Sequence, residues 1–442
     1  MLVNFLEEVM DLIKASILTL GCRVNQYESD FIMEELSKNG AKICHFDEKC
    51  DIYIINTCSV TAESDRKSRQ LIRRCIKKNP EAKVVVTGCF SQINKDGASS
   101  IEGVDLVVGN NEKSKIAKLA LDLYNQKQVS FCGFDIYNGK FDTMSVGAPL
   151  TRTRAFVKIE DGCDSKCAYC IIPYARGSVR SNPPKNVISE VEKIAGEGCC
   201  EVVLTGIETA SYGKDLEGVS LASLLTEINK IDGISRIRLG SLDPYNLTKD
   251  FCKRIAGLEK MMPHFHISMQ SGCTKTLNEM RRKYNIDMAR ERLEYLKASF
   301  DSLMLSADII VGFPNETDED FEKTYEFLKS QRFLHLHIFP YSKREGTPAA
   351  TMKGQVPEEI KKARLHRLEE MQREIKAELL NEFLASHTKT EVLFETYDGE
   401  NVVGHTPNFI EVKAKSEKSL SGKLVTVRLT HTDGEYLYGE IK

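Results

Sequence analysis

The sequence predicts an α/β protein with three parts: an N-terminal doubly wound parallel sheet, a central partial (βα)6 barrel and a small C-terminal β-barrel. Three observations lead to this fold class. Two successive stretches alternate β-rich runs with helical patterns, and the last stretch has short strands and turn residues without helices. The predicted parts are an N-terminal extension over 1–14, the sheet domain over 15–125, a linker over 126–150, the barrel over 151–385 and the terminal β-barrel over 386–442.

In the first part, the β-rich runs are SILTL, KICHF, DIYIINT, KVVVTG and DLVVG. Helical patterns follow from about Gln26, over Ala62–Lys78 and through Leu121. Such alternation predicts parallel strands with helices on both faces of the sheet. The linker carries Gly, Asp, Asn and Pro without sustained periodicity.

In the second part, six β-runs (AFVKI, EVVLT, RIRLG, HFHIS, ADIIVG and HLHIFPY) are separated by helical stretches. These helices are predicted over 186–196, 221–231, 248–256, 287–297 and 318–330. Six βα repeats predict the partial barrel. The charged pattern over 357–385 predicts a helix that leads away from the barrel. Five strands then follow in TEVLFET, NVVGHT, FIEVKA, KLVTVRL and EYLYGEI.

Composition favours a globular protein, with 41% hydrophobic and 28% charged residues among 442. No uncharged apolar run is long enough to span a bilayer. The first fourteen residues mix apolar and acidic positions without a basic segment, so we expect an amphipathic extension and not a signal peptide. The predicted compartment is the cytosol, with no membrane partner. A net charge of −3 gives no global attraction for nucleic acid.

Fourteen cysteines in a cytosolic chain suggest metal chemistry, although a disulfide framework remains an alternative. Cys163, Cys167 and Cys170 form a C-x3-C-x2-C triplet. Three thiolates in one loop can hold three irons of a 4Fe-4S cluster and leave the fourth iron open. A structural zinc site, the other interpretation, needs a fourth ligand nearby. The next cysteines, Cys199 and Cys200, lie beyond an intervening helix.

This triplet, placed directly after the first barrel strand, resembles the radical S-adenosylmethionine (SAM) superfamily. The resemblance implies that SAM binds the open iron and is cleaved to a 5′-deoxyadenosyl radical. It also implies SAM contacts from the segments around 204–206, 239–241, 268–273 and 309–314. The implied SAM contacts are Tyr169, Thr205, Gly206, Ser241, Gln270 and Val311. Loop packing is the alternative role of Tyr169.

Two departures from the superfamily pattern stand out. Gly240 occupies a position where Ser is expected, and Ile207-Glu208-Thr209 is unusual after the second barrel strand. Neither departure removes a predicted cluster ligand. They put the SAM contacts in doubt, and not the activity.

A second cysteine set lies in the first part of the chain. Cys22, Cys58 and Cys89 each come just past the end of a predicted strand. In a doubly wound sheet these ends border the binding crevice, so three thiolates can converge there. The alternative is three unrelated buried cysteines.

The three-part arrangement resembles the methylthiotransferase family over nearly the whole chain. The resemblance implies two 4Fe-4S clusters and SAM as cofactors. It implies that the second cluster carries the inserted sulfur, that a second SAM donates the methyl group, and that the terminal barrel is an RNA-binding TRAM domain.

The segment from Gly21 to Glu28, GCRVNQYE, resembles the branch that acts on N6-threonylcarbamoyladenosine at position 37 of tRNA. The isopentenyladenosine branch usually has Gln-Met between Cys and Asn, and the ribosomal S12 branch has Pro-Lys. The threonylcarbamoyl group carries a carboxylate, which Arg binds through two parallel hydrogen bonds. We therefore assign Arg23 to the reading of that carboxylate. Pairing of Arg23 with a nearby Glu or a cluster sulfide is the alternative.

One predicted helix carries seven basic residues among thirteen positions, without an acid. Its candidate RNA contacts are Arg66, Arg69, Arg73, Arg74 and Lys77. A solvated helix face is the alternative. Further basic residues flank the predicted barrel mouth and are candidates to continue this RNA-binding track: Arg152, Arg154, Arg176, Arg180, Arg281, Arg282 and Lys283. The terminal barrel, with seven Lys and Arg against nine Asp and Glu from Thr388 onward, is unlike a basic RNA-binding module.

The predicted function is the conversion of N6-threonylcarbamoyladenosine 37 of tRNA to its 2-methylthio derivative. The predicted partners are tRNA and a reductant such as flavodoxin or ferredoxin, and the protein is expected to be a monomer. The alternatives are the same chemistry on isopentenyladenosine or a ribosomal protein, and a non-enzymatic RNA-binding protein with structural metal sites.

Overall fold

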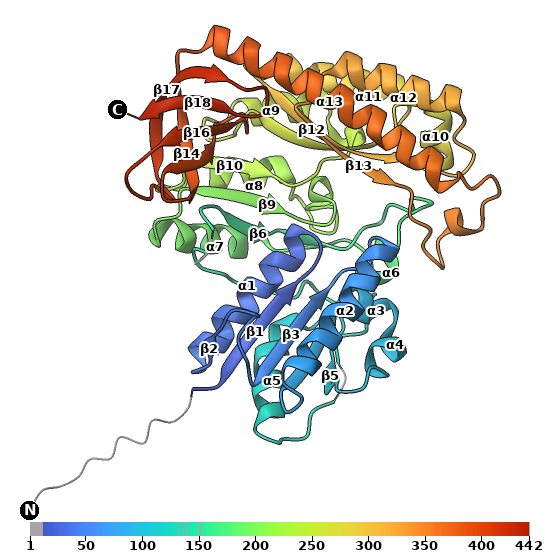
Figure 1. Cartoon of the computed structure of the whole chain (residues 1–442), viewed down its shortest axis with the longest axis vertical. Coiled ribbons are helices and arrows are strands. Elements are labelled where there is room, and N and C mark those ends of the chain that lie inside the picture. The colour runs from blue at the N-terminus through green and yellow to red at the C-terminus, as the bar shows by residue number, and fades with distance from the viewer. Residues whose placement is uncertain (1–11, 131, 138, 150–151, 442) are drawn as a thin grey trace, which may run out of the picture. The chain divides into compact units, whose positions relative to one another are not determined.

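The computed structural model of the protein describes residues 12–130, 132–137, 139–149 and 152–441 (Figure 1). The first eleven residues of the predicted N-terminal extension lie outside the described residues. The chain forms two compact units. The first comprises Met1–Met144 with Tyr174–Arg176, and the second comprises Ser145–Pro173 with Gly177–Lys442.

The first unit is built on a five-stranded parallel sheet with the order β2-β1-β3-β4-β5. Its strands are β1 (Lys14–Thr19), β2 (Lys42–Ile43), β3 (Ile52–Thr57), β4 (Lys83–Gly88) and β5 (Leu106–Val107). Its helices are α1 (Arg23–Lys38), α2 (Ala62–Lys78), α3 (Cys89–Ile93), α4 (Lys95–Ser99), the 3-10 turn η1 (Lys113–Lys115) and α5 (Ile116–Tyr124). The edge strands are shorter than predicted. The five-residue helices α3 and α4 were not predicted, because such short segments show no periodicity.

Side chains of this sheet alternate between two apolar cores, as expected for a doubly wound sheet. Ile54 and Val85 pack on the side of α1 and α5, whereas Tyr53, Ile55 and Val84 pack on the side of α2. The strand order places a topological switch point between β1 and β3, where successive crossovers run in opposite directions. Ligands of such sheets bind beside the carboxyl ends of the strands at this point.

The second unit contains six parallel strands in two hydrogen-bonded groups, β10-β9-β6 and β11-β12-β13. Isolated bridges join β10 to the chain at Met261 and β11 to Leu242. The strands are β6 (Ala155–Lys158), β9 (Glu201–Thr205), β10 (Arg236–Leu239), β11 (His264–Gln270), β12 (Met304–Val311) and β13 (His335–Pro340). The predicted partial (βα)6 barrel is confirmed.

Each barrel strand is followed by a helix. The helices are α6 (Ile172–Arg176), α7 (Pro184–Gly196), α8 (Leu221–Ile228), α9 (Lys249–Ala256), α10 (Thr274–Glu279), α11 (Ile286–Lys297), α12 (Asp318–Gln331) and α13 (Glu358–Ser386). Shorter elements are β7 (Glu160–Asp161), β8 (Arg180–Ser181) and the 3-10 turns η2 (Thr209–Ser211), η3 (Pro244–Asn246) and η4 (Pro348–Thr351). Most predicted helix limits agree with these bounds to within three residues.

The C-terminal part is a closed barrel with the order β14-β15-β16-β18-β17. Its strands are β14 (Lys389–Tyr397), β15 (Asn401–His405), β16 (Glu411–Lys415), β17 (Leu424–Thr432) and β18 (Leu437–Ile441). Closure leaves no unpaired strand edge. The predicted small β-barrel is confirmed, and its likeness to a TRAM domain stays a prediction.

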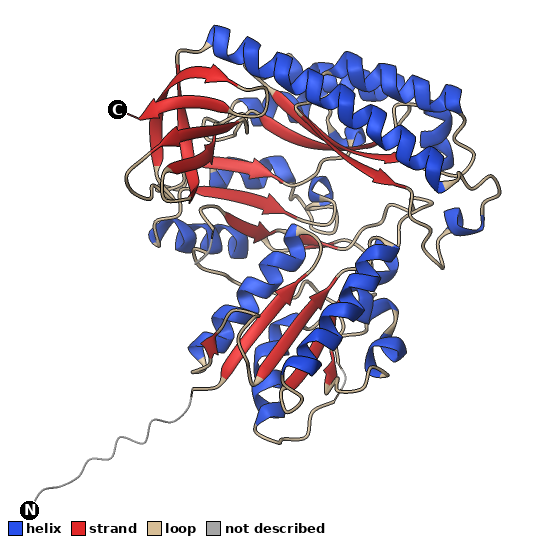
Figure 2. Cartoon of the chain, in the orientation of Figure 1, coloured by secondary structure: helices blue, strands red, loops and turns tan. Residues whose placement is uncertain are grey.

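The prediction that the long helix leads away from the barrel is wrong. α13 packs along β13 and continues to β17 of the terminal barrel (Figure 1). Its buried Leu368, Met371 and Leu380 belong to the same apolar core as Phe394 and Val412. The many charged residues of α13 obscured this apolar stripe in the sequence. Figure 2 shows the helices that accompany α13 along one side of β12 and β13.

No helix within the described residues has the length and apolar character needed to cross a membrane.

Candidate active site and cluster-binding cysteines

The first cysteine triplet lies in a loop between β7 and α6. The backbone N–H of Cys163 donates to the carbonyl of Gly177 (2.9 Å), and that of Cys170 donates to the carbonyl of Cys167 (3.1 Å). Gly162 has φ +89°, and a Cβ there would lie 2.0 Å from the Ser178 carbonyl oxygen. Only glycine therefore permits the backbone at position 162 to lie this close to Ser178. The backbone folds the triplet into one compact loop.

Burial and neighbouring hydrogen-bond donors act in opposite directions on the thiols of this loop. Burial raises the pKa of Cys163 to about 11 and that of Cys170 to about 12. The Ser165 N–H donates to Cys163 Sγ (3.4 Å) and the Arg282 guanidinium donates to Cys167 Sγ (3.3 Å). Donors of this kind stabilise a thiolate once a metal has displaced its proton. The donor set fits an iron–sulfur cluster.

The alternatives to a cluster fit less well. Every cysteine of the chain is a free thiol, which argues against a disulfide framework. Among the described residues, three ligand atoms come within 4.8 Å of one another only at His266, Asp308 and His337. The sulfurs of each cysteine set are thus spaced too widely for a single zinc ion. A cluster binds each thiolate through a different iron, and so it suits the wider spacing.

The predicted SAM residues lie at the carboxyl ends of the barrel strands, where barrels of this kind carry their chemistry. Thr205 ends β9, Gln270 ends β11 and Val311 ends β12, while Ser241 follows β10. Gly206 is the residue after Thr205, and a Cβ there would lie 2.5 Å from a carboxylate oxygen of Glu160. The structure thus brings these residues to one end of the barrel. Their contact with SAM stays a prediction.

Tyr169 lies within the cysteine loop. Its ring packs edge-on against Phe313, with 6.4 Å between the ring centroids. Its hydroxyl accepts a hydrogen bond from Arg282 (3.4 Å). Burial raises the pKa of Tyr169 well above its ordinary value, so the phenol is neutral. These contacts support both the loop-packing role and a place beside a bound cofactor.

The two departures from the superfamily pattern explain each other. A Cβ at Gly240 would lie 2.6 Å from the hydroxyl oxygen of the buried Thr209. Thr209 therefore occupies the space that a serine side chain at this position would need. The presence of Thr209 after β9 therefore requires a glycine, and not a serine, at position 240 after β10.

Four charged residues of this barrel end were not predicted as part of the site. Arg282 donates to the carboxylate of Asp243 (2.7 Å), and the Glu208 N–H donates to Glu160 (2.9 Å). Burial and the nearby Asp243 raise the pKa of Glu208 to about 7. Glu160, Glu208 and Asp243 follow β6, β9 and β10, and Arg282 lies between α10 and α11, so no local spacing reveals them. Assignment of Arg282 to an exposed RNA track is wrong, because only 6% of its side chain is exposed.

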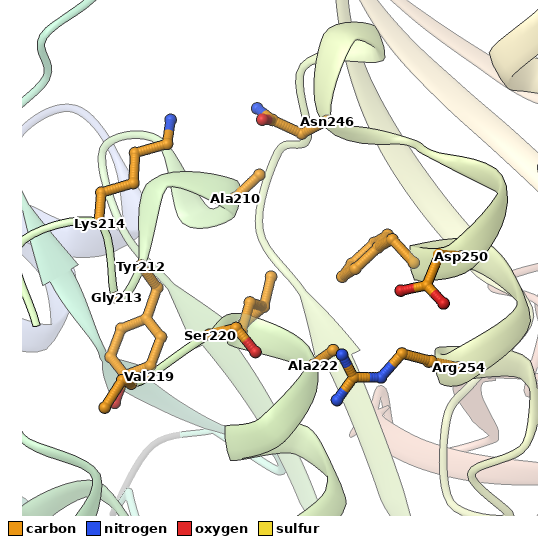
Figure 3. A pocket seen from close by; sticks show the side chains of 12 residues that line it. Ala210, Tyr212, Gly213, Lys214, Val219, Ser220, Ala222, Asn246, Asp250 and Arg254 are labelled. Carbon is orange, nitrogen blue, oxygen red and sulfur yellow. The ribbon is translucent and has the colours of Figure 1, made fainter. Parts of the chain in front are cut away.

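A surface pocket of about 290 Å³ lies beside this end of the barrel, between η2, α8, η3 and α9 (Figure 3). Lys214, Asp250 and Arg254 are among the residues that line it. None of the predicted SAM residues lines this pocket. It is therefore separate from the predicted cofactor site.

In the first unit, Cys22, Cys58 and Cys89 lie past the ends of β1, β3 and β4. Two of them flank the switch point between β1 and β3. Gly21 has φ +99°, and a Cβ there would lie 2.9 Å from Cys58 Sγ, which brings the ends of β1 and β3 close together. Burial raises the pKa of Cys58 to about 11, with further contributions from Cys89 and Cys22. The three thiols are neighbours, as strand-end placement predicts.

A buried ion network lies behind these cysteines. Glu28 accepts hydrogen bonds from Lys113 and from Arg176 (2.5 and 3.2 Å), and all three side chains are fully buried. Asn25 donates to the carbonyls of Leu20 (2.7 Å) and Thr57 (2.9 Å). Its side chain thus ties the ends of β1 and β3. The network orders the backbone that carries Cys22 and Cys58.

Replacement of Glu28 by Ala is expected to lower the free energy of unfolding of this unit by about 3–5 kcal/mol, because it leaves two buried cations without a counter-ion. Urea denaturation followed by circular dichroism measures the change. The control is Glu63→Ala, which breaks an exposed pair with Arg66 and should have little effect. A Glu28→Ala protein as stable as the Glu63→Ala protein would contradict the role of the network.

The predicted RNA helix is α2, with the bounds expected from the sequence. Ser68, Ile72 and Cys75 point inward, and most of its basic side chains are exposed. Arg66 pairs with Glu63 (2.6 Å) and Arg74 with Asp47 (3.0 Å). Within the described residues, Arg73 and Lys77 form no ion pair. Arg69 is half-buried, with its guanidinium over the Phe90 ring.

Part of the basic track predicted around the barrel mouth is wrong. Arg176 is buried in the network above, and Arg180 is buried near Asp161. Arg154 pairs with Glu201 (2.8 Å) and with Glu395. These arginines hold internal carboxylates and do not form an exposed surface for RNA.

Comparison with known proteins places this arrangement in a family. Residues 14–109 match the uncharacterized protein family UPF0004, and residues 157–328 match the radical SAM superfamily. The chain is 38% identical over 429 residues to a threonylcarbamoyladenosine tRNA methylthiotransferase of Bacillus subtilis, covering 96% of this chain and 95% of that protein. The chain belongs to the methylthiotransferase family. The predicted family is thereby confirmed, and with it a radical SAM enzyme that uses iron–sulfur clusters and SAM.

Other relatives of this methylthiotransferase divide between two substrates. The same-named protein of Aquifex aeolicus is 38% identical, covering 94% of this chain and 99% of that protein. A tRNA-2-methylthio-N6-dimethylallyladenosine synthase of Natranaerobius thermophilus is 35% identical, covering 96% of each chain. Among solved structures, the radical SAM methyltransferase TsrM of Kitasatospora setae has a TM-score of 0.56 at 13% identity, covering 76% of this chain and 74% of that one. This likeness supports the fold alone.

Proposed function

We propose that this methylthiotransferase converts N6-threonylcarbamoyladenosine 37 of tRNA to its 2-methylthio derivative. The observation that carries the proposal is the 38% sequence identity, over nearly the whole chain, to enzymes named for this substrate. Two free cysteine triads at the carboxyl ends of two different parallel sheets support it. One triad serves radical generation and the other serves sulfur insertion.

We assign Cys163, Cys167 and Cys170 to the radical-generating cluster. With a 4Fe-4S cluster and SAM bound there, the site supplies a radical that removes a hydrogen atom from an unreactive C–H bond. The residues of the chain hold and polarise this site. Arg282 directs positive charge to Cys167 Sγ (3.3 Å), and its own orientation is held by Asp243 (2.7 Å). The predicted SAM residues lie at the neighbouring strand ends.

We assign Cys22, Cys58 and Cys89 to the second cluster. Cys22 and Cys58 flank the switch point of the first sheet and Cys89 follows the adjacent strand β4, and these strand-end positions support the assignment. The buried network of Glu28, Lys113 and Arg176 keeps the loops in place. No fourth cysteine follows the same pattern, so each triad leaves one iron for an exogenous ligand.

Arg23 is proposed to select the substrate. It is exposed, is the first residue of α1 and directly follows Cys22. A carboxylate-bearing substrate gains two charge-assisted hydrogen bonds from an arginine, whereas a dimethylallyl group gains none. The position next to a proposed cluster ligand suits a residue that reads the modified base.

Arg23→Ala is expected to lower kcat/KM for tRNA bearing threonylcarbamoyladenosine by roughly 10–100-fold, because the lost bonds are worth on the order of 1.5–3 kcal/mol. The loss should be smaller with unmodified adenosine at position 37. Arg23→Lys is the matched variant, since it keeps the positive charge but cannot form the two parallel hydrogen bonds of a guanidinium. Mass spectrometry of digested tRNA nucleosides measures both substrates. An unchanged preference in Arg23→Ala would show that another residue selects the substrate.

The exposed basic side chains of α2 are the proposed contacts with tRNA. Arg66, Arg73, Arg74 and Lys77 are available at the surface, and contacts of this kind weaken steeply as salt rises. The half-buried Arg69 contributes less. The terminal barrel, with its excess of acidic residues, contributes few phosphate contacts in this proposal.

We further propose a flavodoxin- or ferredoxin-type reductant and a monomeric enzyme.

A further inference from the structure

Three side chains able to bind a metal meet on neighbouring strands of the partial barrel. His266 lies on β11, Asp308 on β12 and His337 on β13. All three point away from the surrounding helices, because the alternate residues such as Phe265 and Ala307 belong to the apolar core beneath those helices. They share the inner face of the curved sheet.

The spacing of these side chains suits a single ion. Nε2 of His266 lies 3.0 Å from Oδ1 of Asp308, and Nδ1 of His337 lies 3.5 Å from the same oxygen. The three ligand atoms all lie within 4.8 Å of one another. A ligand atom lies about 2.0–2.2 Å from its ion. Two such atoms are about 2.8–3.6 Å apart when the ligand–ion–ligand angle is between a right angle and the tetrahedral angle. Both imidazole–carboxylate distances fall in this interval.

We propose that His266, Asp308 and His337 form a binding site for one divalent transition-metal ion. Two imidazoles and one carboxylate are a donor set of open iron and zinc sites in proteins. Magnesium and calcium prefer oxygen ligands throughout, so the two imidazoles disfavour them. The site is independent of the two cysteine triads and of the proposed substrate.

The site is open on one side. The His337 side chain is 58% exposed and that of His266 is 11% exposed. Three protein ligands leave at least one coordination position for water or an oxygen atom of a ligand. His266 precedes the end of β11 by four residues, about 13 Å along the strand. The ion would therefore sit deeper in the barrel than the strand ends beside the cysteine loop.

The competing explanation is a hydrogen-bonded His–Asp–His cluster that holds no ion. It accounts for the 3.0 Å distance at His266. The 3.5 Å distance at His337 exceeds the usual 2.7–3.2 Å of an N–H···O hydrogen bond, by about 0.3 Å at least. One ion accounts for both distances. Other titratable groups near this face are His335, two residues before His337, His405 and Lys376.

Zinc titration into the cluster-reconstituted protein, after chelator treatment and desalting, tests the proposal. Calorimetry is expected to show one zinc ion per chain. His337→Gln should raise the Kd by about tenfold or more, since loss of even an outer-sphere partner of a metal ligand has such an effect. His337 is largely exposed, so this variant should fold, and its cluster absorbance checks that. His366→Gln, which removes an exposed histidine of α13 paired with Glu369, should bind zinc like the unmodified protein.

X-ray absorption at the zinc edge then identifies the ligands. The expected spectrum has a nitrogen and oxygen shell with imidazole scattering and no sulfur shell. A sulfur shell would place the zinc on cysteines and overturn the proposal. Failure of the unmodified protein to bind zinc, or equal binding by His337→Gln, would overturn it as well and favour the hydrogen-bonded cluster.

Discussion

Replacement of Cys163 by Ala is expected to abolish reductive cleavage of SAM. The loop from Cys163 to Cys170 supplies three thiolates and no fourth, so loss of one leaves too few ligands for the cluster. The Arg282 guanidinium and the Ser165 N–H are placed to stabilise thiolates of this loop in particular. The iron content after anaerobic reconstitution should fall from about eight to about four per chain.

Chromatographic detection of 5′-deoxyadenosine, with dithionite as reductant, measures this effect. The matched control is Cys200→Ala, which removes a half-buried cysteine of the same unit outside the triplet. The control should retain cleavage and iron. Continued SAM cleavage by Cys163→Ala would mean that radical generation occurs elsewhere in the chain.

Cys22→Ala is expected to separate SAM cleavage from formation of the methylthio product. SAM cleavage should continue, while formation of the methylthio product should fall to background. The reason is that Cys22 belongs to the other sheet, where Cys22 and Cys58 flank the switch point and Cys89 follows the adjacent strand β4. The iron content should again fall by about half.

The measurement combines 5′-deoxyadenosine detection with mass spectrometry of tRNA nucleosides from the same reaction. Cys132→Ala is the control, because Cys132 is a half-buried cysteine of the same unit outside the triad. Loss of SAM cleavage together with methylthiolation in Cys22→Ala would argue against separate roles for the two triads.

Most of the fold was predictable from local patterns. Alternating β-runs and helices indicate parallel sheets, and α2 has the limits that its sequence predicts. The strand-end positions of Cys22, Cys58 and Cys89 were also visible, because a strand and the residue after it are local features. The sheet order, which places Cys22 and Cys58 at the switch point and Cys89 after the adjacent strand, depends on pairing between distant segments and required the structure.

The charged residues of the interior could not be predicted. Glu28 and Arg176 are separated by 148 residues in the sequence, and Arg282 and Asp243 by 39. A basic residue looks the same in sequence whether it faces water or an internal carboxylate. For this reason Arg176, Arg180 and Arg282 were assigned to an RNA surface, although each is mostly or fully buried. The course of α13 was missed for a similar reason, since its apolar stripe is masked by charges.

The most direct test of the proposed substrate is the reaction of the reconstituted protein with tRNA that carries either threonylcarbamoyladenosine or isopentenyladenosine at position 37. The reaction contains SAM and a reductant, and mass spectrometry of the digested nucleosides measures the product. We expect the 2-methylthio derivative of threonylcarbamoyladenosine and little product from isopentenyladenosine. Preferential methylthiolation of isopentenyladenosine, or no product from either tRNA by a protein with both clusters, would contradict the proposal.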